Sequence, residues 1–177
     1  MAETDEQGGT EHTEAEHTGT EHTDAEGTPI PEQVHENYAN EQVRAALHAL
    51  QQTPDYDHLA AFLTSLREGY LVVDVSGTPS KKRGHRVRTI RSTRGQLVLP
   101  LFTSMDELRA VTPAGQHDQF RGAVMPAKQA LSLIGSDRFV AAEFDKAGQS
   151  LVVLRKYIML VLGSDAAITA ETLEMMK

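Results

Sequence analysis

Residues 96–111, QLVLPLFTSMDELRAV, constrain the fold more than any other part of the chain. Residues 97–102 form a short apolar run that is typical of a buried β-strand. Pro100 lacks an N–H group, so it predicts an edge, a bulge or the last third of that strand. Ser104 and Glu107 have the spacing of a capping box, in which each side chain accepts a hydrogen bond from the other residue's backbone N–H. We therefore expect a strand, a tight turn and a short helix.

Two amphipathic helices are predicted ahead of this segment. Their apolar stripes are Val43, Ala46, Leu47 and Leu50 in the first helix and Leu59, Phe62, Leu63 and Leu66 in the second. The first helix is expected to begin near residues 37–40. Thr53 and Pro54 predict the cap and the first position of the second helix. Gly69 predicts its left-handed end.

The remaining elements alternate between short strands and helices. Before the 97–102 run we expect a strand over 70–75, a polar loop over 76–84, an irregular strand over 86–92 and a turn at 93–95. After the short helix we expect a loop over 112–120, a brief strand over 123–125 and a helix from Pro126 to Gly135. A hairpin of 139–144 and 150–154 around the sequence DKAG and helical segments over 157–162 and 166–176 complete the chain. The predicted fold class is α/β (α+β mixed), a small mixed sheet with flanking helices, preceded by a disordered acidic tail.

Several of these segments resemble one known family. The sequence LPLFTSMDEL is similar to the signature segment of the SseB family, the proteins that carry an SseB N-terminal-type domain. The flanking segments NEQVRAALHALQQTPDYDHLAAFLTSLREGYLVVDV, AVMPAKQALSLI and FVAAEFDKAGQSLVVLRKYI resemble the same family in the same order. The resemblance covers residues 40–158. It implies a small mixed α/β domain with no established catalytic site.

The charge distribution divides the chain into a tail and a domain. Residues 1–41 hold 12 Asp or Glu and no Lys or Arg, and the rest holds 17 basic against 13 acidic residues. Residues 9–18 and 19–28 repeat a sequence of Glu, Thr, His and Gly that has almost no apolar side chain to bury. We expect a disordered tail over 1–39, an SseB-like domain over 40–163 and a C-terminal helical segment over 164–177.

Catalytic and metal-binding patterns are weak. The sequence has no cysteine, and it lacks the common hydrolase, nucleotide-binding and zinc-protease motifs. A triad drawn from Ser104, His117 and Asp118 depends on spatial geometry that the sequence does not give. Three tail histidines, His12, His17 and His22, recur every five residues, but binding a metal there would require ordering the tail. We expect no catalytic residue, no cofactor and no resident metal.

A basic strip is the one candidate interaction surface. It consists of Lys81, Lys82, Arg83, Arg86, Arg88, Arg91 and Arg94, with no acidic residue between Val75 and Met105. The favoured interpretation is a solvated edge strand that resists aggregation. Binding of an acidic protein segment comes second. Nucleic-acid binding comes third, because the strip has no aromatic residue on which bases could stack. The family resemblance does not account for this strip.

The expected function is that of a non-enzymatic, bacterial SseB-like domain that acts through protein–protein contacts. An unknown protein partner is expected, and the oligomeric state stays open. No secretory signal and no apolar run long enough to span a membrane is present, so we expect a cytoplasmic protein with no membrane contact. The alternatives are an accessory to sulfur-transfer or serine-related metabolism, which the family name suggests, and a nucleic-acid-associated protein. Without cysteine, this chain cannot carry a persulfide itself.

The two charged segments give a testable prediction. A flexible tail of about 40 residues spans roughly 35 Å, enough to reach the basic strip. We expect truncation to residue 37 to raise heparin affinity markedly at low salt, because the acidic tail then no longer competes with the polyanion. The gap should close at high salt, where the Debye length falls below about 10 Å. Equal affinity of the two proteins at every salt concentration would contradict a contact between tail and strip.

Overall fold

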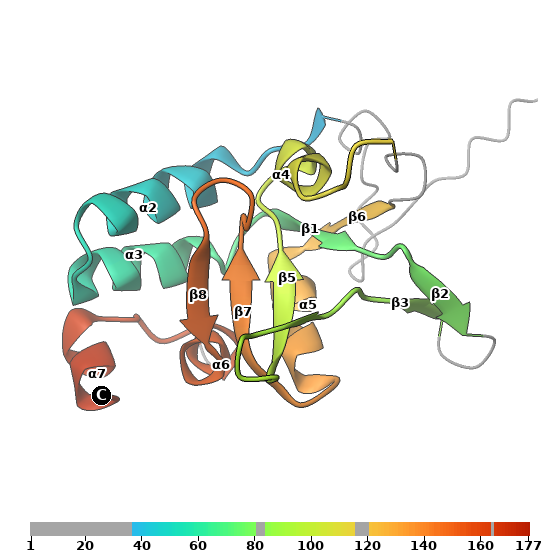
Figure 1. Cartoon of the computed structure of the whole chain (residues 1–177). Coiled ribbons are helices and arrows are strands. Elements are labelled where there is room, and N and C mark those ends of the chain that lie inside the picture. Colours follow the sequence, from blue (N-terminus) through green and yellow to red (C-terminus); the bar gives the residue numbers. More distant parts are fainter. Residues whose placement is uncertain (1–36, 81–83, 116–120, 164) are drawn as a thin grey trace, which may run out of the picture.

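The computed structural model describes residues 37–80, 84–115, 121–163 and 165–177, without the side chains of residues 77–86 (Figure 1). The predicted acidic tail lies outside the described residues as far as residue 36. The contacts of Tyr38 and Ala39 place these two residues with the folded domain rather than with the tail. The Tyr38 hydroxyl donates to the Tyr70 carbonyl over 2.8 Å, and Ala39 forms a β-bridge with Ser104.

A four-stranded mixed sheet forms the centre, in the order β4–β5–β7–β8. Strands β5 (Leu97–Leu101) and β7 (Phe139–Phe144) are parallel, whereas β4 (Ile90–Arg91) and β8 (Leu151–Leu154) are antiparallel to their neighbours. The register between β5 and β7 shifts near Val98, which indicates a bulge at the start of the parallel pair.

Two smaller strand pairs accompany this sheet. Strands β1 (Tyr70–Asp74) and β6 (Gly122–Pro126) are antiparallel, and β2 (Gly77–Ser80) pairs with β3 (Gly84–Arg86). The β1–β6 pair is attached to the end of β5 through Val72 and Phe102. The backbone N–H of each of these two residues donates to the carbonyl of the other, over 2.8 and 3.0 Å.

The helices are α2 (Glu41–Gln52), α3 (Tyr56–Ser65), α4 (Met105–Ala110), α5 (Ala127–Ser132) with the 3₁₀ turn η2 (Leu133–Gly135), α6 (Arg155–Gly163) and α7 (Ala170–Met175). In Figure 1, α2, α3 and α5 lie behind strands β5, β7 and β8. On that face of the sheet, Leu99, Phe144 and Val153 join one buried core with residues of α2, α3, α5, α6 and α7. An edge-to-face contact between Phe62 and Phe144, with ring centroids 5.3 Å apart, packs α3 directly on β7.

The central predictions are confirmed. The strand over residues 97–101, the α4 helix and the β7–β8 hairpin all form, and the predicted fold class is the observed one. Strand β4 pairs with β5 only at Leu97 and Val98, so no neighbour needs a donor at Pro100. The proline therefore lies in the last third of its strand, where its missing N–H costs no ladder bond.

Three local predictions need correction. The second helix is capped by Asp55, whose side chain accepts from the His58 N–H, while Thr53 ends the first helix instead. Part of the expected loop over 76–84 is strand β2. The expected strand over 86–92 is divided between β3 and β4, because residues 87–89 join no strand ladder and only the Arg88 N–H donates to the end of β1, at the Asp74 carbonyl.

The C-terminal segment belongs to the core. Helix α7 is shorter than the expected 166–176, and it packs on α3. Ile168 and Leu173 are buried among the main core residues, so residues 165–177 pack as part of the domain. Within the described ranges, no helix is both long and apolar enough to cross a membrane.

The buried end of β5 should dominate stability. Leu99→Ala and Phe102→Ala should each cost about 2–5 kcal/mol in urea unfolding, because both side chains are buried. Ser104→Ala should cost about 1 kcal/mol, the usual contribution of a cap. Val152→Ala, at an exposed position, is the control and should change stability by less than about 0.5 kcal/mol. A Leu99→Ala protein as stable as the control would contradict this account of the core.

Candidate functional site

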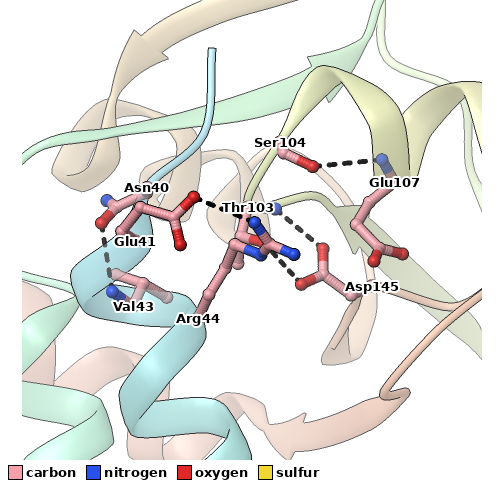
Figure 2. A network of polar contacts seen from close by, with 8 residues as sticks. All are labelled: Asn40, Glu41, Val43, Arg44, Thr103, Ser104, Glu107 and Asp145. Carbon is pink, nitrogen blue, oxygen red and sulfur yellow. Dashed lines mark hydrogen bonds and ion pairs between the residues drawn. The ribbon is translucent and has the colours of Figure 1, made fainter. Parts of the chain in front are cut away.

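A network of polar contacts lies where the parallel strands β5 and β7 end (Figure 2). Carboxyl ends of parallel strands meet at one edge of a sheet, so Thr103 after β5 lies beside Asp145 after β7. Asp145 is 2 % exposed. Its carboxylate accepts from the Thr103 backbone N–H over 2.8 Å and from the Thr103 hydroxyl over 2.6 Å. We call this pair the Thr103–Asp145 clip.

The backbone N–H and C=O groups of Asp145 are also hydrogen-bonded. The Asp145 N–H donates to the Leu101 carbonyl over 3.1 Å, and the Asp145 carbonyl accepts from the Gly148 N–H over 3.0 Å. The φ of Asp145 is 46°, in the left-handed region that non-glycine residues rarely adopt, although aspartate tolerates it better than most. The hydrogen bonds on both sides of the residue therefore hold a strained turn between β7 and β8.

The capping box next to the clip is only half formed. The Ser104 hydroxyl accepts from the Glu107 N–H over 3.2 Å, as expected. The Glu107 carboxylate, however, lies against Gly148, where an added Cβ would come within 2.8 Å of Oε1. Glu107 Oε2 is buried and has no hydrogen-bond partner among the described residues. The reciprocal half of the predicted box is therefore wrong, because Glu107 reaches the β7–β8 turn instead.

A cavity of about 370 Å³ opens beside this network. It is lined by Glu41, Arg44, Ala45, Leu47, His48, Glu107, Asp145 and Gln149. Burial raises the pKa of Asp145, and the hydrogen bonds from Thr103 and the charge of Arg44 act against that shift. Burial and then the charge of Asp145 raise the pKa of Glu107, while Arg44 lowers it. The Arg44 guanidinium itself pairs with Glu41 over 3.0 Å.

The contacts of these groups indicate a structural role. Both carboxylate oxygens of Asp145 accept hydrogen bonds from Thr103, and the Ser104 hydroxyl caps α4. No group of three histidine or acidic side chains that could hold a metal ion occurs in the described residues. The network joins the end of β5, the start of α4 and the β7–β8 turn into one unit.

A second feature lies along β8 and was not predicted from the sequence. In the sheet order, β8 is an edge strand, and its Val152 and Leu154 side chains are 55 % and 49 % exposed. A groove of about 700 Å³ follows this strand on the helix side. It is lined by Leu50, Gln51, Pro54, Asp55, Tyr56, Leu59, Leu151, Val152, Val153, Leu154 and Tyr157. We call it the β8 groove.

The family model of the SseB protein N-terminal domain matches residues 43–155. The chain belongs to this family. The matched range includes the Thr103–Asp145 clip and all of β8, and it ends at the first residue of α6. No curated protein and no solved structure matches the chain.

Most of the candidate catalytic and metal residues considered from the sequence lie outside the described residues. His117 and Asp118 lie outside the described residues, as do His12, His17 and His22. Ser104 is buried and serves as the α4 cap. The expectation that this serine is not part of a catalytic triad therefore stays a prediction.

The basic strip of the SseB domain is described only in part. Lys81, Lys82 and Arg83 lie outside the described residues, and so does the side chain of Arg86. Arg88 pairs with the buried Asp74 over 3.8 Å. Arg91 donates to the Gly95 carbonyl over 2.9 Å, and Arg94 lies exposed in the turn before β5. An interaction through this strip stays a prediction.

The clip predicts different effects for two substitutions of Asp145. Asp145→Ala removes both acceptors and leaves a buried N–H unpaired, so it should cost about 1–3 kcal/mol in urea unfolding. Asp145→Asn keeps an acceptor for the Thr103 N–H and tolerates the left-handed backbone, so it should cost less. Equal stability of Asp145→Ala and the unsubstituted protein would contradict a stabilising clip.

The same variants should differ in pH dependence. Because the pKa of Asp145 is raised on folding, its contribution to stability is fully present below the usual aspartate pKa. That contribution is lost as the pH rises through the raised value. The stability of Asp145→Asn relative to the unsubstituted protein should therefore increase when urea unfolding is measured at pH 7 instead of pH 4. A difference that is the same at both pH values would refute this linkage.

Proposed function

We propose that this SseB domain acts by binding another protein and catalyses no reaction of its own. The β8 groove carries the proposal. It combines an exposed apolar strand edge with an adjoining apolar hollow, the combination that protein-binding surfaces use.

The contrast between the two sheet edges supports this role. Natural edge strands are usually short, charged or interrupted by proline, which prevents pairing with other chains. Strand β4 fits this pattern, because it has two residues and one of them is Arg91. Strand β8 has the sequence LVVL, with neither charge nor proline. An unprotected apolar edge is a liability unless a partner covers it.

The cavity of about 370 Å³ beside the Thr103–Asp145 clip supports the non-enzymatic part of the proposal. Catalytic acids and bases need room to exchange protons with a substrate. Here each carboxylate oxygen of Asp145 accepts a hydrogen bond from Thr103, and the Ser104 hydroxyl accepts from the Glu107 N–H of α4. These contacts favour a role in positioning the β7–β8 turn.

Site-specific photo-crosslinking tests the proposal. A photoreactive amino acid at position 152, in the full chain within its native cells, should form a covalent adduct with a discrete protein. Leu154→Asp should abolish that adduct, because it places a charge in the exposed apolar edge. Met159→Asp, at a similarly exposed position on α6, should preserve it. No adduct, or an adduct that both substitutions leave unchanged, would refute binding at the β8 groove.

A further inference from the structure

The β8 groove also indicates the form in which a partner binds, an inference that depends on the proposed function. We propose that the partner inserts one extended segment alongside β8 as an additional strand, with large apolar side chains at every second position. Backbone hydrogen bonds would provide affinity, and the groove would select the side chains. The argument rests on the backbone of β8, the position of the helices and the sequence of the tail.

The ladder between β5 and β7 shows which way the β7 backbone points. The Asp145 N–H donates to the Leu101 carbonyl of β5. Peptide groups alternate in direction along a strand, so Phe144 and Ala142 direct their N–H and C=O groups to the other side, toward β8. Their partners there are Leu151 and Val153.

The alternation then continues across β8. Because Leu151 and Val153 bond to β7, Val152 directs its backbone N–H and C=O groups toward the open edge, and Leu154 directs its N–H there. Within the described part of the chain, no strand lies beyond them. The carbonyl of Leu154 directly precedes α6 and accepts in the first turn of that helix, so two donors and one acceptor are aligned along the groove for an added strand.

Side chains on the two faces of an added strand would meet different surroundings. On the helix side, alternate residues enter the groove and contact Leu50, Tyr56, Leu59 and Tyr157. On the other face, residues lie beside Val152 and remain partly in water, as Val152 itself does. Large apolar side chains are therefore required at every second position, and small or polar ones are tolerated between them.

The helices disfavour a second copy of the chain as the occupant. In Figure 1, α2 and α3 extend sideways past β8, so they overhang the strand edge. A symmetric antiparallel pairing of β8 with β8 of another copy would place both helix layers on the same face of the joined sheet. The overhanging helices of the two copies would then compete for the same space. A single extended segment has no helix layer and avoids this clash.

The tail of the same chain is an equally poor occupant. Residues 1–36 are acidic, and their only large aliphatic side chains after Met1 are Ile30 and Val34, with Pro29 and Pro31 beside the first. These residues provide no alternation of large apolar side chains, and proline removes backbone donors. We therefore assign the segment to a different protein.

Charge adds one feature to the segment. Asp55 is the one charged residue among the described residues that line the groove. Its carboxylate is partly exposed at the start of α3, where it accepts from the His58 N–H over 2.8 Å and pairs with the His58 ring over 2.7 Å. A lysine or arginine next to the apolar positions would meet this carboxylate.

A designed peptide tests the mode of binding. The probe is a nine-residue peptide with valine at every second position, threonine between, and a lysine at each end. Leu154→Pro removes an outward N–H, and Leu154→Ala keeps it while also shortening the side chain. Pro126 is the precedent for proline at such a position, since it is the last residue of β6 and directly precedes α5.

Fluorescence anisotropy of the labelled probe should show binding to the full chain. Leu154→Pro should weaken it by about two- to tenfold relative to Leu154→Ala, the change expected for one hydrogen bond. A probe with the same composition but grouped valines should bind less tightly than the alternating one. Equal affinity of the proline and alanine variants, or of the two probes, would overturn strand addition.

These outcomes separate the inference from the proposed function. Photo-crosslinks at position 152 together with equal probe affinities would leave a protein-binding groove but exclude an added strand. Loss of the photo-crosslinks would remove the proposed function itself. Concentration-dependent dimers in analytical ultracentrifugation that Leu154→Pro abolishes would overturn the inference in favour of a second copy.

Discussion

The hydrogen bonds between Thr103 and the Asp145 carboxylate are the interaction on which the arrangement of this domain depends. The carboxylate is buried, and it accepts two hydrogen bonds from Thr103, a residue 42 positions away. The backbone carbonyl of Thr103 accepts from the Asn40 N–H over 2.7 Å, and the Asn40 side chain caps α2. One residue pair therefore joins the end of β5, the β7–β8 turn and the start of α2. A buried carboxylate is costly unless it is hydrogen-bonded, so the parts of this junction are interdependent.

The clip also explains why the β7–β8 turn is strained rather than relaxed. The left-handed backbone at Asp145 costs on the order of 1–3 kcal/mol and persists only where its surroundings over-determine it. Here the surroundings are the Leu101 carbonyl, the Thr103 groups and Gly148, which leaves room for the Glu107 carboxylate. The turn has little freedom to shift, so the start of β8 is fixed relative to β5.

Local signals in the sequence predicted the elements, and non-local pairing decided the site. The β5 strand, the Ser104 cap and the β7–β8 hairpin each depend on residues within a few positions of one another. Asp55 was missed as a cap because Thr53 followed by proline is also a good start signal, and the choice depends on where α2 ends. The polar sequence of β2 has no apolar alternation that would indicate a strand. The partner of Asp145 is too distant along the chain for any local pattern to identify it.

The β8 groove was hidden for a related reason. The sequence LVVL is typical of a buried strand, and it becomes an edge only because β8 is last in the sheet order, which no local pattern encodes. Gln51 at the end of α2 donates to the carbonyls of Gln149 and Ser150, so the groove is anchored at the start of β8 as well as through the clip. An edge held at this end loses less conformational entropy when a partner binds than a mobile strand would. The strained turn therefore links the stability of the fold to the shape of its exposed edge.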